Sequence, residues 1–431
     1  MVHTFQALGV NVAVDVNSGA VHVLDELTYH LLEQVKPPMA EHCPEEVCQT
    51  LSRYAPAALE EAWQELRRLT AEGLLFEEDD YIDREKAASM QQQALVKALC
   101  LHVSHDCNLR CKYCFASTGD FGTGHRRNIE VDFFGGEPLM AIDTVKRAVE
   151  YARSIEEAHG KCFRFTITTN GVLLDDETIE YINREMSNAV LSLDGRKAVN
   201  DDLRPTINGK GSYDVIVPKF RKLIEGRGTK DYYLRGTFTR FHQDFAEDVK
   251  ALAAIGKNIS VEPVVGKETD PYALQEADLP ALKAEYERLA EYLRDHPETN
   301  FFHFNVDLAQ GPCVIKRLRG CGAGCEYVAI TPEGDIYPCH QFVGNEEYKL
   351  GSLYDGSFDQ ALSGTFAALN IYTREECRSC WARFYCSGGC SASNLLVNGD
   401  IKRPHRVGCE LERKRLECAI ALKAIAAGMG A

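Results

Sequence analysis

The chain has 431 residues, of which 45% are hydrophobic, and a formal net charge of −16 at pH 7. Its length is sufficient for two or three domains of ordinary globular composition. The negative charge argues against the basic surface of a general nucleic-acid or anionic-membrane binder. No run of about 18 apolar residues predicts a membrane helix, and the first residues do not form a secretion signal. We therefore expect a cytoplasmic protein that binds neither nucleic acid nor membrane.

Cysteine is the most unusual part of the composition. The chain has 17 cysteines, and ten of them lie between Cys313 and Cys418. Because cytosolic thiols stay reduced, so many cysteines are unusual unless they bind metal, and their clustering predicts metal centres rather than scattered core thiols. Five cysteines outside the motifs described below are assigned to packing, namely Cys43, Cys48, Cys100, Cys162 and Cys418.

Residues 1–90 are predicted to form a separate unit. Alternating apolar residues in 11–24, on either side of Gly19, predict a β-hairpin. Amphipathic helices are expected at 26–35, 44–54 and 59–73, and the short strand-like segment Leu74–Phe76 completes a winged-helix-like pattern. The acidic segment 77–80 disfavours DNA reading, whereas an exposed hairpin edge can pair with an extended peptide. The alternative is a subdomain that only caps the rest of the chain.

Strand and helix patterns alternate between residues 98 and 266. Strands are predicted at 98–104, 128–134, 164–169, 188–193, 232–239 and 258–265, with helices at 141–159, 176–186 and 213–225 between them. This alternation predicts an α/β fold in which a parallel sheet curls into a partial (β/α)6 barrel of the TIM type. The connection 115–128 is short for a crossover, so we expect residues to be missing near Gly122–Thr123.

Three cysteines follow the first of these strands with C-x3-C-x2-C spacing, namely Cys107, Cys111 and Cys114. A four-iron cluster normally takes four cysteines, so three ligands would leave one iron open. The alternatives are free thiols, or a zinc site completed by His102 or His105.

Polar motifs follow the next three strands. The second strand ends in Gly135-Gly136-Glu137-Pro138, where two glycines permit close backbone approach and Glu137 can accept a hydrogen bond from an ammonium group. The later candidates are Asn170, Ser192, Asp194 and Arg204. An arginine fork matches a carboxylate. The alternatives are a simple turn at 135–138, a surface ion pair for Arg204, and loop geometry for Asn170 and Asp194.

The last third of the chain contains a second cysteine array. Cys321 and Cys325 precede a strand–turn–strand pattern that ends at Cys339. The remaining members have C-x2-C-x5-C-x3-C spacing followed by a single cysteine, and they are Cys377, Cys380, Cys386, Cys390 and Cys409. Paired C-x2-C motifs also occur in zinc ribbons, which is the alternative here.

Together these motifs resemble the radical S-adenosylmethionine enzymes that carry a SPASM domain. The resemblance implies that Cys107, Cys111 and Cys114 are catalytic and hold a [4Fe–4S] cluster whose open iron binds S-adenosylmethionine. The implied contacts to that cofactor are Gly135, Gly136, Glu137, Pro138, Asn170, Ser192, Asp194 and Arg204.

The resemblance also implies two auxiliary [4Fe–4S] clusters, which makes three clusters in all. The outer one would be held by Cys377, Cys380, Cys386 and Cys409. The inner one would be held by Cys339 and Cys390, completed by Cys321 and Cys325, while Cys313 competes with Cys321 for the upstream position. If one of these is not a ligand, the inner cluster has an open iron.

Within this group the chain most resembles maturases of small cysteine-rich ribosomal peptides, the SCIFF-type thioether-forming (sactipeptide or ranthipeptide) enzymes. The implied domains are a leader-recognition domain at 1–90, a radical barrel at 91–300 and a SPASM domain at 301–431. A 5′-deoxyadenosyl radical would take a hydrogen from a peptide carbon, to which a cysteine sulfur is then joined. The implied partners are a precursor peptide with a leader, and an electron donor such as ferredoxin or flavodoxin. The alternatives are an anaerobic sulfatase maturase that forms formylglycine, and a non-catalytic iron–sulfur or zinc peptide-binding scaffold.

Overall fold

The computed structural model describes residues 1–79, 96–104, 128–308 and 318–428. Three predictions lie outside these residues: the Cys107, Cys111 and Cys114 loop, the proposed gap at Gly122–Thr123, and Cys313. Among the described residues, no helix has the length and apolar character needed to cross a membrane.

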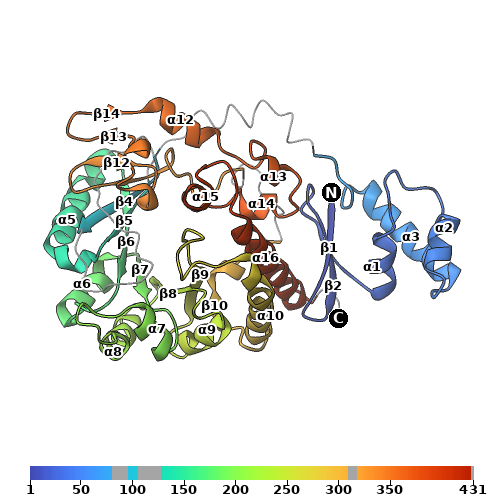
Figure 1. Ribbon diagram of the computed structural model, residues 1–431, viewed down its shortest axis with the longest axis horizontal. Helices are drawn as coiled ribbons and strands as arrows, with labels where there is room; N and C mark the ends of the chain where they lie inside the picture. Colours follow the sequence, from blue (N-terminus) through green and yellow to red (C-terminus); the bar gives the residue numbers. More distant parts are fainter. Residues whose placement is uncertain (80–95, 105–127, 309–317, 429–431) are drawn as a thin grey trace.

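Within the described residues the largest element is a sheet of eleven strands, called the main sheet below (Figure 1). Its strand order is β10-β9-β8-β7-β6-β5-β4-β11-β12-β13-β14. Neighbouring strands from β4 to β10 are parallel and follow one another in chain order. These strands are β4 (Ala98–Ser104), β5 (Asn128–Gly135), β6 (Cys162–Thr169), β7 (Asn188–Ser192), β8 (Asp231–Phe238), β9 (Asn258–Pro263) and β10 (Asn300–Phe301). All six predicted strands are therefore confirmed, within a few residues at their ends.

Helices connect the parallel strands from β5 onwards. They are η1 (Pro138–Ala141), α5 (Ile142–His159), α6 (Asp176–Glu185), α7 (Lys197–Leu203), α8 (Tyr213–Glu225) and α9 (Phe245–Ala253). Between β9 and the C-terminal third lie η2 (Glu276–Asp278), α10 (Leu279–Asp295) and η3 (Phe302–Phe304). The mixed α/β class with a large parallel sheet is thus as predicted.

Side chains alternate between the two faces of the parallel strands. In β5, Ile129, Val131 and Phe133 are buried in the main hydrophobic core, which the connecting helices share. The intervening residues of β8, such as Arg235 and Thr237, are only half-buried. One face of the main sheet is therefore a dry packing surface, and the other is available for polar chemistry.

The C-terminal third extends the main sheet on the β4 side. The antiparallel strands β11 (Tyr327–Ile330), β12 (Asp335–Tyr337), β13 (Gly351–Ser352) and β14 (Ser357–Phe358) continue from β4, which pairs with β11 in parallel. Helices η4 (His340–Phe342), η5 (Glu346–Tyr348), α12 (Gln360–Ala368), α13 (Glu375–Arg378), α14 (Arg383–Cys386), α15 (Ser391–Asn398) and α16 (Arg406–Ala426) complete this part.

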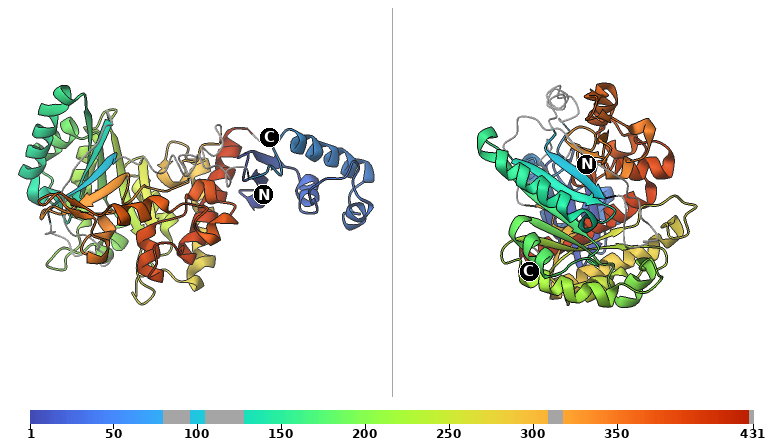
Figure 2. Two further views of the ribbon diagram at one scale, coloured as in Figure 1. Left: turned by 90° about the horizontal axis from the view of Figure 1, so that it is seen from above. Right: turned by 90° about the vertical axis from the view of Figure 1, so that its left-hand side faces the viewer.

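The N-terminal module, residues 1–79, lies at one end of the molecule beyond α16 (Figures 1 and 2). It contains an antiparallel sheet of β1 (Val2–Ala7), β2 (Val10–Asp15) and β3 (Val21–Leu24). Its helices are α1 (Glu26–Leu32), α2 (Glu45–Thr50) and α3 (Pro56–Ala71). The hairpin and helices are as predicted, but the strand at Leu74–Phe76 is wrong: these residues form bends. The third strand is β1 instead, so the winged-helix arrangement is not confirmed.

The N-terminal module is docked on the cysteine-rich part of the chain. Phe5, Val12 and Val14 share a hydrophobic core with Trp381 and Phe384. The ring of His3 stacks on that of Trp381 with centroids 4.1 Å apart, and His3 Nε2 lies 3.0 Å from Glu417 Oε1 on α16. This sheet therefore packs on the segment that carries most of the second cysteine array.

Candidate functional site

A cavity of about 630 Å³ opens at the carboxyl ends of β5 to β9. The predicted residues Gly135, Gly136, Glu137, Asn170, Ser192 and Arg204 all line it. Pro138 and Asp194 are not among the lining residues; Pro138 begins the 3₁₀ helix η1 behind the cavity. Motifs that are distant in sequence are thus brought together at the edge of the sheet where parallel α/β proteins carry their sites.

Hydrogen bonds of Glu137 connect the loop after β5 to the end of β6. Its carboxylate accepts hydrogen bonds from the Thr169 hydroxyl at 2.7 Å, from Asn170 N at 2.7 Å and from Leu139 N at 3.1 Å. The side chain is 1% exposed, and this burial raises its pKa to about 7 although the three hydrogen bonds oppose the rise. An anionic group at this position suits a cationic ligand, and it already holds the cavity wall in shape.

Arg204 lines the cavity and forms an ion pair with Asp194. Its Nε donates to Asp194 Oδ2 at 2.8 Å and its Nη2 to Asp194 Oδ1 at 3.0 Å, while Thr237 N also donates to Asp194. The carboxylate of Asp194 is buried and Arg204 is mostly buried. Asp194 therefore orients the guanidinium rather than lining the cavity, which places a preorganised cation beside Ser192.

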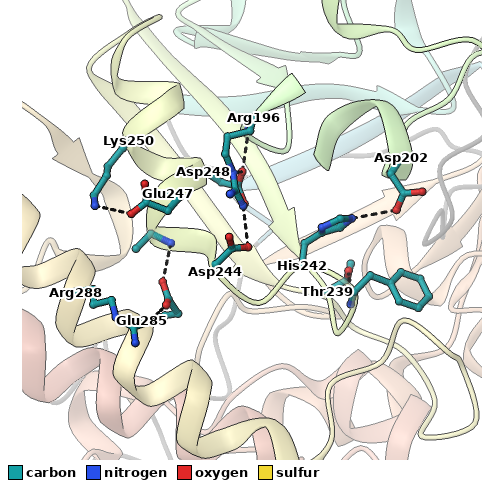
Figure 3. A network of polar contacts seen from close by, with 12 residues as sticks. Arg196, Asp202, Thr239, His242, Asp244, Glu247, Asp248, Lys250, Glu285 and Arg288 are labelled. Carbon is teal, nitrogen blue, oxygen red and sulfur yellow. Dashed lines mark hydrogen bonds and ion pairs between the residues drawn. The ribbon is translucent and has the colours of Figure 1, made fainter. Parts of the chain in front are cut away.

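A network of charged residues holds the turn that precedes Arg204 (Figure 3). Asp248 on α9 accepts hydrogen bonds from Arg196 N at 2.9 Å and from Arg196 Nε at 2.8 Å, and Asp244 accepts from Arg196 Nη2 at 2.7 Å. Gly195 has φ +119°, and a Cβ there would lie 2.2 Å from Asp248. Only glycine permits this close contact, which fixes the backbone between Asp194 and α7.

Arg235 and Glu262 are lining residues that the predicted motifs did not include. They lie on β8 and β9 and form an ion pair at 2.6 Å. Although burial opposes it, the charges of Arg235 and His303 hold the pKa of Glu262 down at about 2. Both residues face the same side of the sheet as Ser192. The alternation of their strands was the signal that could have identified them.

The C-terminal third forms the opposite wall of the cavity. Phe342 from η4 and Leu395 and Leu396 from α15 contribute apolar surface. Cys390 is the N-cap residue of α15, and its Sγ accepts a hydrogen bond from Ser393 N at 3.5 Å. A predicted cluster ligand therefore lies two residues before Ala392, which lines the cavity.

Four cysteines of the second array share a smaller cavity of about 350 Å³, namely Cys377, Cys380, Cys386 and Cys409. Burial and the nearby thiols raise the pKa of Cys377 to about 11. Among the described residues, no three His, Cys, Asp or Glu side chains converge closely enough to hold one metal ion. The thiols instead surround a volume that can contain an iron–sulfur cluster.

Cationic groups around this cavity fit an anionic cluster. Arg383 and Arg413 line it, and Arg413 Nη1 lies 3.9 Å from Cys380 Sγ. Arg374 is buried beside the cysteines. Burial lowers the pKa of its guanidinium, and the charges of the cysteines partly offset that decrease. In the described part of the chain the Nε atoms of Arg374 and Arg383 are buried without a hydrogen-bond partner. Donors left in this way suit an acceptor such as a cluster sulfide.

Cys321, Cys339 and Cys390 are separate in sequence but interact electrostatically in the fold. Burial raises the pKa of the Cys339 thiol well above its usual value, and the charges of Cys390 and Cys321 add to the rise. Cys325 is also buried, and its Sγ donates to Gly322 O at 3.3 Å and accepts from Arg319 Nη1 at 3.4 Å. Three of the predicted inner ligands, Cys321, Cys339 and Cys390, thus interact electrostatically, while Cys325 has hydrogen bonds of its own.

An open-edged parallel α/β sheet with a cofactor-sized cavity and a cysteine-rich cap defines the class of protein. A family model described as an iron–sulfur cluster-binding domain, SPASM, matches residues 321–381. Mycofactocin maturase MftC from Mycolicibacterium smegmatis is 28% identical over 342 residues, covering 73% of this chain and 83% of that protein. The radical SAM cyclopropyl synthase TigE from Paramaledivibacter caminithermalis is 22% identical over 73% of this chain and 72% of its own length.

Solved structures show the same fold. The enzyme anSMEcpe with bound AdoMet has a TM-score of 0.62 at 19% identity, covering 77% of this chain and 99% of that chain. Streptococcus suis SuiB bound to its precursor peptide SuiA has a TM-score of 0.51 at 18% identity, covering 93% of this chain and 97% of that chain. Over most of its length the chain is therefore similar to mycofactocin maturase and TigE, and its residues 321–381 match the SPASM iron–sulfur cluster-binding domain.

Proposed function

We propose that the protein is a radical S-adenosylmethionine enzyme that forms thioether crosslinks in a ribosomally made, cysteine-rich peptide. The observation that carries the proposal is the shared cavity. Glu137, Ser192 and Arg204 line one side of it, and α15, whose N-cap residue is Cys390, lines the other. A cofactor and a peptide bound there would both lie beside the predicted auxiliary site.

The residues present fit S-adenosylmethionine. The carboxylate of Glu137 suits the ammonium of its methionyl part, while Ser192 and the preorganised fork of Arg204 suit the carboxylate. Cys107, Cys111 and Cys114 are proposed to hold the first cluster, and the second array the two auxiliary clusters. When bound, these groups supply the electron that cleaves S-adenosylmethionine to methionine and a 5′-deoxyadenosyl radical, and an acceptor for the surplus electron. The chain itself positions the reactants and excludes water.

The atoms balance for thioether formation. The peptide loses one carbon-bound hydrogen atom, which ends in 5′-deoxyadenosine, one thiol proton and one electron. The bond that forms joins the cysteine sulfur to the carbon. The apolar wall of Phe342, Leu395 and Leu396 is suited to holding the acceptor residue away from water.

The N-terminal module supports a peptide substrate. Among the described residues, β3 is an edge strand of its sheet, so its outer backbone groups are available to an added strand. Because the likeness to SuiB covers 93% of the chain, it includes most of this module. SuiB is bound to a precursor peptide in that structure. Of the alternatives, sulfatase maturation leaves this module without a role, and a non-catalytic scaffold leaves the Arg204 arrangement without one.

The test is production of 5′-deoxyadenosine by anaerobically reconstituted protein given dithionite and S-adenosylmethionine. We expect product from the wild type, none from Cys107→Ala, and unchanged product from Cys418→Ala, whose thiol is buried in a packing core. If a short cysteine-rich peptide is encoded in a neighbouring reading frame, mass spectrometry of that peptide after the reaction should show the loss of two hydrogens per crosslink. Absence of 5′-deoxyadenosine from the wild type refutes the enzyme assignment.

A further inference from the structure

Arg383 contacts both the N-terminal module and the cavity that the four predicted outer-cluster cysteines share. Arg383 is 3% exposed and lines the cavity of Cys377, Cys380, Cys386 and Cys409. Its Nη2 also donates to Asn17 Oδ1 at 2.6 Å and to Asp79 Oδ2 at 2.9 Å. A single guanidinium therefore contacts the turn between β2 and β3 and the last residue of the module, and it also borders the cavity.

The surroundings give this contact a defined geometry. Arg383 Nη1 donates to Arg378 O at 2.6 Å, and Tyr372 donates its hydroxyl to Asp79 Oδ1 at 2.9 Å. The side chain of Asn17 donates to Glu77 O at 2.7 Å, and this bond joins the turn between β2 and β3 to the last residues of the module. Residues 17 and 79 are thus held together where they meet Arg383.

We propose that Arg383 is a positioning residue that couples the docking of the N-terminal module to the reduction of the outer cluster. This inference rests on the cluster proposed for the four cysteines. On reduction the cluster accepts one electron, supplied in the experiment by dithionite, and becomes more negative by one charge. The nearby cation stabilises the reduced form, and Asp79 offsets that effect because it neutralises the guanidinium.

The coupling has a direction. Docking places Asp79 against Arg383, so the docked module lowers the reduction potential of the outer cluster. Thermodynamic reciprocity requires that reduction in turn weakens docking. Displacement of the module, for example by a peptide that pulls on its sheet, therefore favours electron uptake at the outer cluster.

Redox titration of the full-length reconstituted protein tests this proposal, with the outer cluster identified by the signal that disappears in Cys409→Ala. Asp79→Asn should raise the potential and Arg383→Gln should lower it, each changing the reduced-to-oxidised ratio at fixed potential about two- to fivefold. The matched control is Glu78→Gln, an exposed neighbouring acid, which should change nothing. A residue with only a structural role would shift both variants in the same direction. The proposal is overturned if both variants shift the reduction potential in the same direction. It is also overturned if neither variant shifts the potential while the signal of the outer cluster is present.

Hydrogen–deuterium exchange of the full-length protein gives a second readout. Backbone amides of Val2–Ala7 should exchange severalfold faster in the reduced protein than in the oxidised protein, with β6 as an internal reference. In Asp79→Asn this difference should disappear. Equal exchange in the two redox states of the wild type contradicts the coupling. Loss of all cluster signals would instead contradict the proposed cofactor content, so the two failures are distinguishable.

Discussion

Glu137 shows how one side chain can serve the cavity wall and a ligand together. Three donors converge on its carboxylate. Glu137→Gln turns an amide N–H₂ group toward one of them, so we expect a loss of about 1–3 kcal/mol of stability. The control is Glu130→Gln, an exposed residue of the same strand, with an effect within about 0.5 kcal/mol. Chemical denaturation of matched preparations measures both, and equal stabilities would contradict this role of Glu137.

The same residue gives a pH dependence. Since burial raises the pKa of Glu137 from its usual value to about 7, the folded chain binds its proton more tightly than the unfolded chain does. The contribution to stability is therefore present below the unfolded pKa and is lost as pH rises toward 7. Between about pH 5 and 7.5 the melting temperature of the wild type should fall relative to that of Glu137→Gln. A constant difference would refute the raised pKa.

Gly195 offers a second test at the scale of a residue. Because an added Cβ would collide with Asp248, Gly195→Ala should displace the turn that leads to Arg204 and weaken binding of S-adenosylmethionine at least tenfold. Gly209 also has a positive φ, +73°, but no atom in the described part of the chain lies within 4 Å of the position that an added methyl group would take. Gly209→Ala is therefore the matched control. Equilibrium dialysis measures the affinity of both variants for S-adenosylmethionine, and the comparison separates the collision with Asp248 from the effect of a positive φ alone. Equal affinities of the two variants would contradict the role of the turn.

At the scale of elements, much of the main sheet could be predicted because its strands carry strong apolar alternation and end in polar motifs. Ala98–Ser104 and Tyr213–Glu225 have the predicted bounds. β1 was missed because Val2–Ala7 mixes polar and apolar residues without a clear period, and Leu74–Phe76 was wrong because an apolar triplet alone does not make a strand. Two-residue strands such as β13 depend on pairing partners that lie elsewhere in the chain.

The candidate site divides in a similar way. Motifs with a fixed spacing, such as Glu137 and Arg204, could be found because the chemistry demands those residue types. Asp194 was expected near a ligand, yet it orients Arg204 from behind. The contacts of Arg383 to Asn17 and Asp79 join segments 366 and 304 residues apart, and no local pattern encodes such contacts.

The edge strand β3 supplies the prediction for peptide recognition. Along an edge strand, the backbone N–H groups point alternately toward the neighbouring strand and toward the free edge. His22 and Val23 are adjacent in β3, so proline at one of them removes a donor from the free edge. Proline at the other disrupts pairing with β2. The variant that keeps wild-type stability should lose at least tenfold in precursor affinity, measured by fluorescence anisotropy. It should still form 5′-deoxyadenosine. Unchanged affinity in both variants contradicts recognition at β3.

At the scale of the whole molecule, the two cysteine groups predict a graded iron content. Replacing one outer ligand, as in Cys409→Ala, should remove about one third of the iron if three four-iron clusters are present. Cys418→Ala, further along α16 and fully buried, should retain all of it. Iron and sulfide assays on anaerobically purified protein measure this. Equal iron content in the two variants contradicts the assignment of Cys409.

The pairing of β4 with β11 has a consequence for biosynthesis. Ala98–Leu101 hydrogen-bond with Tyr327–Ile330, so one edge of the parallel strands is covered by a segment made more than 200 residues later. While the chain is being translated, β4 has no neighbour on that side until the cysteine-rich region has left the ribosome. An exposed strand edge is a template for aggregation. Fragments that stop near residue 300 are therefore expected to be recovered as aggregates, because the β4 edge is covered only after the cysteine-rich segment has been made.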